Sequence, residues 1–271
     1  MNQYKSNQYK SYAKLNRFIH VLKKRSDGYH EIQSLFQLID LSDTITFKKR
    51  KDERISIKSN IKKLEQKNII FETVSLIKEK YPKKNIGLDI ELKKQIPLGS
   101  GLGGGSSNAA TTLEALNTIY NLNIEKQKLR TIGARLGADV PFFVNGKNAW
   151  VEGKGDILTN IHIKPSLFIL IFSEHVISTR EMYQSLNLSD KNQDYSYEDF
   201  LNGNTSNTFE RHVFRKFPSI KKAAEKLSNY GPARMTGSGG TLFLPENESE
   251  RAKEILKKLP KEYDAKLVSS L

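Results

Sequence analysis

Alternating apolar and polar positions in the first third of the chain predict β-strands. Residues 12–22 are rich in β-branched and aromatic side chains, and Ser26-Asp27-Gly28 after them is a turn signal. Residues 32–39 and 44–47 have the composition of two further strands. Residues 86–92 alternate with a period of two, which indicates a strand with one buried face.

Other segments have helical spacing. Residues 68–79 repeat apolar side chains at the spacing of one helical face, and Tyr81-Pro82 predicts the end of that helix. A second helix begins directly after the glycine-rich residues 99–105, with Ser106 or Ser107 as its expected N-cap. Its apolar stripe consists of Ala109, Leu113, Leu116 and Tyr120.

A third helix is predicted over residues 127–136. It leads to Gly137-Ala138-Asp139-Val140-Pro141, where the proline disfavours a helical Val140, so we expect the helix to stop there.

The pattern of apolar and polar residues changes in the last third of the chain. Residues 167–172 form an apolar run of strand length, and residues 190–207 are polar and predict a loop. Helices are expected over 218–230 and 249–259, and strands over 241–244 and at the C-terminus. The change near residues 155–165 predicts two domains, residues 1–158 and 159–271.

Composition adds a strong positive charge. Lysine and arginine number 44 against 30 acidic residues, a formal net charge of +14, which favours anionic partners such as nucleic acid, an anionic membrane surface or phosphorylated metabolites. The chain has no cysteine, which excludes disulfides, cysteine-ligated zinc and thiol nucleophiles. No signal peptide or membrane-spanning stretch is present in the sequence, so we expect a soluble cytoplasmic protein. The lysine-rich residues 48–63 are expected to be solvated surface.

The glycine cluster predicts a phosphate site, because backbone amides without side chains can approach an oxyanion at a helix N-terminus. It is no Walker loop, since Gly105 is followed by Ser106-Ser107-Asn108 and no lysine. The match to a dinucleotide fingerprint is weak, because Pro97 separates the cluster from its strand and no acidic residue follows at about 20 residues. Protein-kinase catalytic triplets are absent.

The cluster resembles the ATP-phosphate loop of the GHMP kinases, the superfamily of galactokinase, homoserine kinase and mevalonate kinase. Other segments agree with it in the same order along the chain. The matching segments are Ala13-Lys14-Leu15-Asn16 and residues 27–36, 97–110, 137–143 and 236–240. In the last of these Gly240 stands where the family more often has Ala or Cys, which predicts a looser loop there.

The resemblance implies an α+β fold with two domains. The N-terminal domain would be related to a ribosomal-protein fold and would hold the glycine-rich ATP loop, and the C-terminal domain would be ferredoxin-like. The sequence pattern alone indicates only a mixed α and β protein in two parts.

The resemblance also implies ATP-dependent phosphorylation of the 2-hydroxyl of a methylerythritol joined to cytidine diphosphate, in non-mevalonate isoprenoid precursor synthesis. Asp139 would be the base and Lys14 the cation that orients it. From the sequence alone, Asp139 suits a turn equally well, and most lysines on strands are solvated. The expected ATP-binding residues are Pro97, Gly99, Ser100, Gly101, Leu102, Gly103, Gly104, Gly105, Ser106 and Ser107 around the phosphates, and Asn68 and Lys94 near the adenine.

For the substrate, the resemblance implies that Tyr29 and Tyr183 sandwich the cytosine and that His30 reads its edge. Asn16 and Thr179 would position the erythritol end. Magnesium is expected with ATP, and its protein ligand stays open, with Ser106 or Ser107 as candidates.

Two alternatives remain. The first is another small-molecule GHMP kinase, for mevalonate, homoserine or a sugar, although those substrates have no base for Tyr29 and Tyr183 to stack on. The second is a basic RNA-binding protein, supported by the net charge of +14 but not by any stripe of alternating aromatic and cationic residues. We expect ATP and the cytidine diphosphate compound as partners, with no nucleic acid or membrane. The sequence does not indicate an oligomeric state.

Overall fold

Two long strands, β1 (Asn7–Lys24) and β2 (His30–Lys49), contribute to both of the units into which the chain folds. The computed structural model describes residues 7–188 and 194–271. Within these, the first unit contains residues 7–13, 41–96 and 103–146, and the second contains residues 14–40, 97–102, 147–188 and 194–271. In the described residues no helix is long and apolar enough to cross a bilayer.

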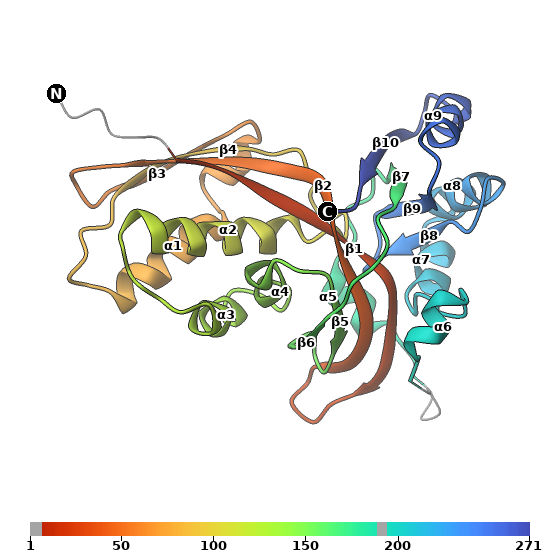
Figure 1. The fold of residues 1–271 in the computed structure, drawn as a ribbon, viewed down its shortest axis with the longest axis horizontal. Coiled ribbons are helices and arrows are strands. Elements are labelled where there is room, and N and C mark those ends of the chain that lie inside the picture. The colour runs from red at the N-terminus through yellow and green to blue at the C-terminus, as the bar shows by residue number, and fades with distance from the viewer. Residues whose placement is uncertain (1–6, 189–193) are drawn as a thin grey trace. The chain divides into compact units, whose positions relative to one another are not determined.

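The first unit packs helices against a sheet. Strand β4 (Leu88–Lys93) pairs antiparallel with residues 44–49 of β2, and β3 (Ile55–Ser59) pairs parallel with β4. Figure 1 shows helices α1 (Ile69–Lys80) and α2 (Gly104–Ile119) beside this sheet. The period of two in β4 places Leu88, Ile90 and Leu92 on the buried face, as predicted.

The first unit also contains a 3-10 helix (Lys62–Glu65), α3 (Lys126–Ala134) and α4 (Val140–Asn145). The prediction that the chain leaves the helical conformation at Val140 is wrong, because α4 begins at this residue. Pro141 lies in the first turn of α4, where a missing N–H costs no hydrogen bond.

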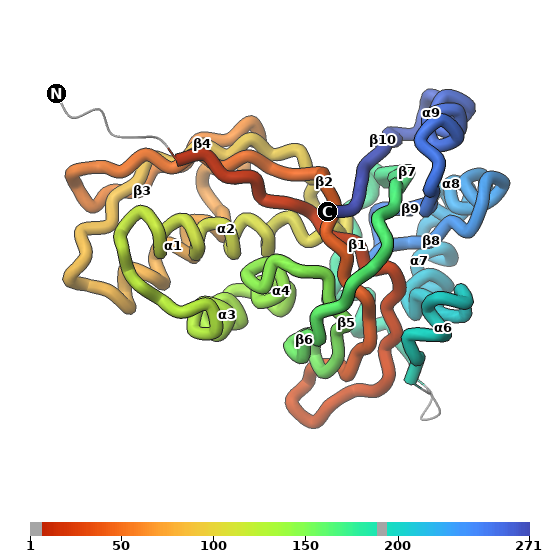
Figure 2. Tube along the Cα trace, in the orientation of Figure 1, coloured from red at the N-terminus to blue at the C-terminus, as the bar shows by residue number. Residues whose placement is uncertain are grey.

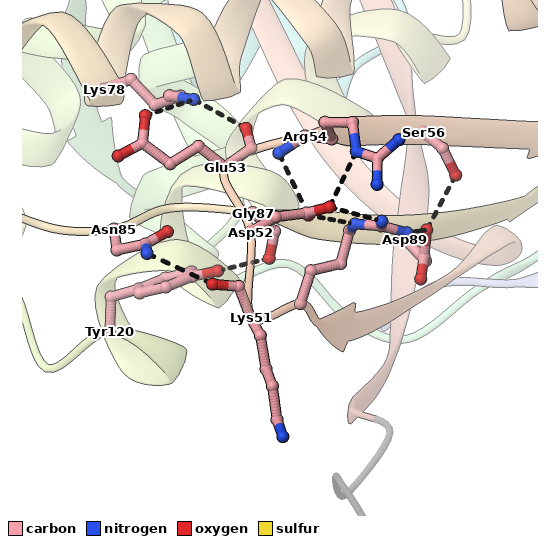
Figure 3. A network of polar contacts seen from close by, with 11 residues as sticks. Lys51, Asp52, Glu53, Arg54, Ser56, Lys78, Asn85, Gly87, Asp89 and Tyr120 are labelled. Carbon is pink, nitrogen blue, oxygen red and sulfur yellow. Dashed lines mark hydrogen bonds and ion pairs between the residues drawn. The ribbon is translucent and has the colours of Figure 1, made fainter.

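A polar network holds residues 50–56 against the rest of the first unit (Figure 3). The guanidinium of Arg50 contacts the carboxylates of Asp52 at 2.6 Å and Asp89 at 2.7 Å. The hydroxyl of Tyr120 donates to the carbonyl of Gly87 at 2.8 Å. A Cβ on Gly87 would lie 1.7 Å from the carbonyl oxygen of Asp52, so only glycine fits this crossing of two backbones.

Among the described residues, the second unit contains a four-stranded sheet and one end of the six-stranded sheet to which β2, β3 and β4 also belong. Residues 34–36 of β2 pair antiparallel with β5 (Ala149–Glu152), which pairs with β6 (Ile157–Asn160). The other sheet is antiparallel, in the order β10-β7-β9-β8. Its strands are β7 (Leu167–Phe172), β8 (Arg234–Thr236), β9 (Thr241–Glu246) and β10 (Asp264–Ser269).

Five helices complete the described part of the second unit, and the tube in Figure 2 follows their course after β7. They are α5 (Thr179–Gln184), α6 (Tyr197–Leu201), α7 (Glu210–Lys216), α8 (Pro218–Ser228) and α9 (Ser249–Lys258). The loop predicted over 190–207 is wrong at α6, where Ser196 and Asp199 form a capping box. Residues 189–193 of that prediction lie outside the described residues.

Candidate functional site

The glycine segment has the backbone conformation that its sequence suggests. Gly99, Gly101 and Gly103 have φ values of 68°, 79° and 70°, a left-handed conformation that glycine adopts without strain. Helix α2 begins at Gly104 with Gly103 as its N-cap, so the prediction of Ser106 or Ser107 as N-cap is wrong. The cap position here requires a left-handed residue, and both serines lie within the first turn of the helix.

Within the second unit, the glycines of residues 236–240 approach the backbone of residues 97–102. A Cβ on Gly101 would lie 2.7 Å from the Thr236 carbonyl oxygen, and a Cβ on Gly240 would lie 2.8 Å from that of Gly99. Gly240 therefore permits a close backbone contact. We expected Gly240 to loosen this loop. The structure instead shows a tight contact, in which a larger residue at position 240 would displace the segment around Gly99.

Within the first unit, a buried polar cluster lies behind the start of α2. The Lys94 ammonium donates to the Asp43 carboxylate, which also accepts the backbone N–H groups of Gln95 at 2.8 Å and Ile96 at 2.9 Å. The Asn108 side-chain amide donates to the same carboxylate at 2.9 Å. Burial lowers the pKa of Lys94, and the Asp43 carboxylate opposes this shift. Sequence reasoning missed Asp43 and Asn108, because nothing local marks Asp43 as buried.

The two serines after the glycines differ in their surroundings. The hydroxyl of Ser107 is buried and accepts a hydrogen bond from Ser11 at 2.8 Å. Ser106 is only partly buried, and a Cβ on Gly137 would lie 3.5 Å from its hydroxyl oxygen. Ser106 therefore lies beside the turn that carries Asp139.

Asp139 and Lys14, the predicted catalytic residues, lie in different environments and different units. Asp139 is the partly exposed N-cap of α4 in the first unit. Lys14 lies on β1 in the second unit and is 3% exposed. Its ammonium donates to Asn16 Oδ1 and lies 4.4 Å from the centroid of the Phe36 ring.

The residues predicted to position the erythritol end are also hydrogen-bonded within the second unit. Asn16 Nδ2 donates to Ser34 Oγ at 3.0 Å, and its backbone N–H donates to Thr236 Oγ1 at 2.8 Å. The hydroxyls of Thr179 and Ser238 are 2.8 Å apart. Asn16 and Thr179 are therefore both bonded to the loop between β8 and β9 or to the strand before it.

Two of the three residues predicted to bind the base form a stacked pair in the structure. The rings of His30 and Tyr183 are stacked, with centroids 4.9 Å apart and planes 29° apart. Tyr29 is 55% exposed, with the ammonium of Lys154 5.0 Å from its ring centroid. Burial, and to a smaller extent Lys24, lowers the pKa of His30. The structure thus pairs Tyr183 with His30 rather than with Tyr29.

The residues predicted near the adenine have internal hydrogen bonds. Asn68 caps α1 by accepting the N–H of Ile70 at 3.0 Å, and its amide donates to the Leu64 carbonyl at 3.1 Å. Lys94 is bonded to Asp43. Their role toward adenine stays a prediction. Residues 7–188 and 194–271 contain no group of three or more His, Cys, Asp or Glu side chains placed to hold a metal ion.

Comparison with known proteins gives the same family in each case. Residues 68–147 match the N-terminal domain model of the GHMP kinases, and residues 196–265 match the C-terminal domain model. A 4-diphosphocytidyl-2-C-methyl-D-erythritol kinase from Francisella tularensis (strain FSC 198) is 38% identical, and the alignment covers 100% of this chain and 98% of the relative.

A kinase of the same name from Hahella chejuensis is 37% identical, with 96% of this chain and 91% of the relative covered. A crystal structure of 4-(cytidine 5'-diphospho)-2C-methyl-D-erythritol kinase is 27% identical and superposes with a TM-score of 0.86, covering 97% of this chain and 99% of that chain. The expected α+β fold with GHMP kinase N- and C-terminal domains is confirmed. The chain belongs to the GHMP kinase family, and within it to the group of the 4-diphosphocytidyl-2-C-methyl-D-erythritol kinases.

Proposed function

We propose that this chain transfers the γ-phosphoryl group of ATP to the 2-hydroxyl of 4-diphosphocytidyl-2-C-methyl-D-erythritol, in non-mevalonate isoprenoid precursor synthesis. The observation that carries the proposal is the 38% identity over the whole chain to a relative of that name. The residues of the candidate site agree with it, because they supply an amide-rich loop, a carboxylate and a buried cation.

In this reaction Asp139 acts as the base. Its carboxylate takes the proton of the 2-hydroxyl, the oxygen attacks the γ-phosphorus, and the bond to the oxygen bridging the β- and γ-phosphorus atoms breaks to release ADP. Lys14 stabilises the negative charge that develops, and Asn16 holds the Lys14 ammonium in position.

The backbone N–H groups around Gly99 to Gly105 bind the phosphates, and the N-terminus of α2 adds a positive partial charge. Magnesium is the expected ion with ATP, and a hydroxyl oxygen with phosphate oxygens and water is a ligand set that it accepts. The partly exposed hydroxyl of Ser106 fits this set better than the internally bonded hydroxyl of Ser107. When bound, magnesium neutralises phosphate charge.

Tyr29, His30 and Tyr183 recognise the cytosine, and Asn16 and Thr179 position the erythritol end. An incoming cytosine would take the place of one ring in the His30–Tyr183 stack. The stacking of a base on an aromatic side chain contributes about 1 to 3 kcal/mol. We infer that the partners are ATP and this substrate, with no nucleic acid or membrane partner, and that the chain works in the cytoplasm.

A coupled ADP-release assay over a panel of acceptors tests the proposal. Turnover with the cytidine diphosphate compound, and none with mevalonate, homoserine or galactose, is the expected result. Turnover with one of the other acceptors alone would assign the chain to another GHMP activity. RNA binding that weakens with salt, in the absence of any turnover, would favour the basic RNA-binding alternative.

A further inference from the structure

A cavity of about 650 Å³ in the second unit is lined by positively charged and aromatic side chains. Its volume lies in the range of small-molecule sites. The side chains that give it its character are Arg17, His162, Lys164, Tyr197, Phe200 and Arg234. No Asp or Glu of the described residues lines it.

Arg17 is the most unusual of these residues. It is partly buried, its guanidinium donates to Gln37 Oε1 at 2.6 Å, and the guanidinium carbon lies 5.0 Å and 5.3 Å from the ring centroids of Phe168 and Phe200. It forms no ion pair in residues 7–188 and 194–271. Burial and the charge of Arg234 lower the pKa of Arg17 to about 10. A partly buried guanidinium in these surroundings is stabilised when an anion binds to it.

Arg234 provides a second guanidinium whose partners are also neutral. It donates to the carbonyl oxygens of Thr205 and, at 2.9 Å, of Gly203. Arg234 forms no ion pair in the part of the chain that the structure describes, although its charge opposes the burial that raises the pKa of Glu210. A guanidinium has five N–H donors, so both arginines keep donors available for a ligand. Planar guanidinium groups suit phosphate oxygens because they can bind two at once.

An aromatic surface lies beside these charges. The rings of Tyr197 and Phe200 on α6 stack with centroids 5.9 Å apart, and Tyr197 is 38% exposed. A planar ligand group can pack against such a ring face.

We propose that this cavity is a binding site for a small phosphate ester with a planar ring, with Arg17 and Arg234 on the phosphate and Tyr197 on the ring. Lys164 adds a third cation at the same site. Side chains alternate along a strand, so Arg17 projects from β1 on the face opposite to Lys14 and Asn16. The cavity is therefore separate from the Lys14 and Asn16 side chains of the proposed phosphoryl transfer.

Calorimetric titration of the full chain with phenyl phosphate, inorganic phosphate and benzoate tests this site. A non-hydrolysable ATP analogue is present at saturation to occupy the nucleotide site. We expect phenyl phosphate to bind more tightly than either other probe. Equal or tighter binding of benzoate would overturn the phosphate assignment, and equal binding of inorganic phosphate would overturn the role of the ring. If phenyl phosphate does not bind at concentrations up to about 5 mM, the proposal of a binding site in this cavity is wrong.

Variants then assign the residues. Arg17→Met and Arg234→Met should each weaken phenyl phosphate at least about ten-fold, the loss expected for a charged hydrogen bond. One of the exposed arginines of α7 serves as a matched control, and Arg211→Met should leave the affinity unchanged. Unchanged affinity in both cavity variants would refute the proposal. If Arg17→Met does not fold, Arg17→Lys is used in its place. We expect this variant to bind phenyl phosphate more weakly than the unmodified chain. Equal affinity would contradict the role of the guanidinium.

Discussion

The Lys94 ammonium donates a hydrogen bond to the Asp43 carboxylate, and both side chains are buried in the first unit. Because Asp43 also accepts the N–H groups of Gln95 and Ile96, the carboxylate fixes the residues directly before Pro97. Through Asn108 it is bonded to helix α2 as well. One buried carboxylate thus joins the chain on both sides of the glycine segment.

Asp43→Asn should destabilise the protein strongly. The change leaves the Lys94 ammonium buried without a negative partner, and breaking a buried ion pair in this way costs about 3 to 5 kcal/mol. The free energy of unfolding from urea denaturation measures the effect. In a double-mutant cycle, Asp43→Asn with Lys94→Met should cost less than the sum of the two single changes. Additive costs would show that the two side chains do not interact.

Gly87→Ala should also destabilise the first unit, because Gly87 lies against the backbone of Asp52; both residues are labelled in Figure 3. The added Cβ would lie 1.7 Å from the carbonyl oxygen of Asp52, so one backbone must move, at a cost of about 3 kcal/mol or more. Thermal unfolding measures the loss. Gly105→Ala is the matched control, since a Cβ there meets nothing within 4 Å and Ala favours a helix. A loss no larger than in the control would contradict the close approach.

Elements with strong periodicity could be predicted from the sequence. The apolar run of residues 167–172 coincides with β7, and the stripe from Ala109 to Tyr120 with the buried side of α2. Short elements such as α4 and α6 could not, because six or five residues carry too little periodicity and depend on caps and tertiary packing.

Some parts of the candidate site could likewise be predicted from the sequence, and other parts could not. The glycine segment has a local signature, since its backbone conformation requires glycine. Asp43 has none, because its burial and its four donors arise from residues more than 50 positions away. The stacking of His30 on Tyr183 likewise depends on tertiary structure, and the family resemblance implied different roles for these two rings.

Gly240→Ala should weaken ATP binding. Gly240 has a φ of 91°, and its Cβ would lie 2.8 Å from the Gly99 carbonyl oxygen, so the substitution displaces the segment proposed to bind the phosphates. We expect the KM for ATP to rise about ten-fold, or about 1.4 kcal/mol. Gly203→Ala imposes a similar backbone strain at a φ of 76° with nothing within 4 Å, and should leave this KM unchanged. Equal effects of the two would exclude the contact with Gly99.

Asp139→Asn should remove the base without removing ATP binding. The amide cannot accept the proton of the acceptor hydroxyl, and loss of general base catalysis costs about 10² to 10⁴ in kcat. Steady-state kinetics with calorimetric titration of ATP separates the two effects. A kcat near that of the unmodified chain would show that Asp139 is not the base.

The stack of His30 on Tyr183 should depend on pH. Burial lowers the folded-state pKa of His30 below its ordinary value of 6.5, so the folded chain favours the neutral ring. The stability from this preference is fully present above pH 6.5 and is lost as the pH falls through the lowered pKa. We therefore expect the KM for the cytidine substrate to rise on the acid side of pH 6.5, while the KM for ATP stays level.

An NMR titration of the His30 ring measures the pKa directly, and it should lie below 6.5. His30→Asn removes the titrating group, so the acid-side rise in the substrate KM should disappear. His162→Asn, at an exposed histidine outside the proposed substrate site, should retain the rise. A rise that persists in His30→Asn would assign the pH dependence to another group, and recognition of the cytosine would then not depend on the protonation of this ring.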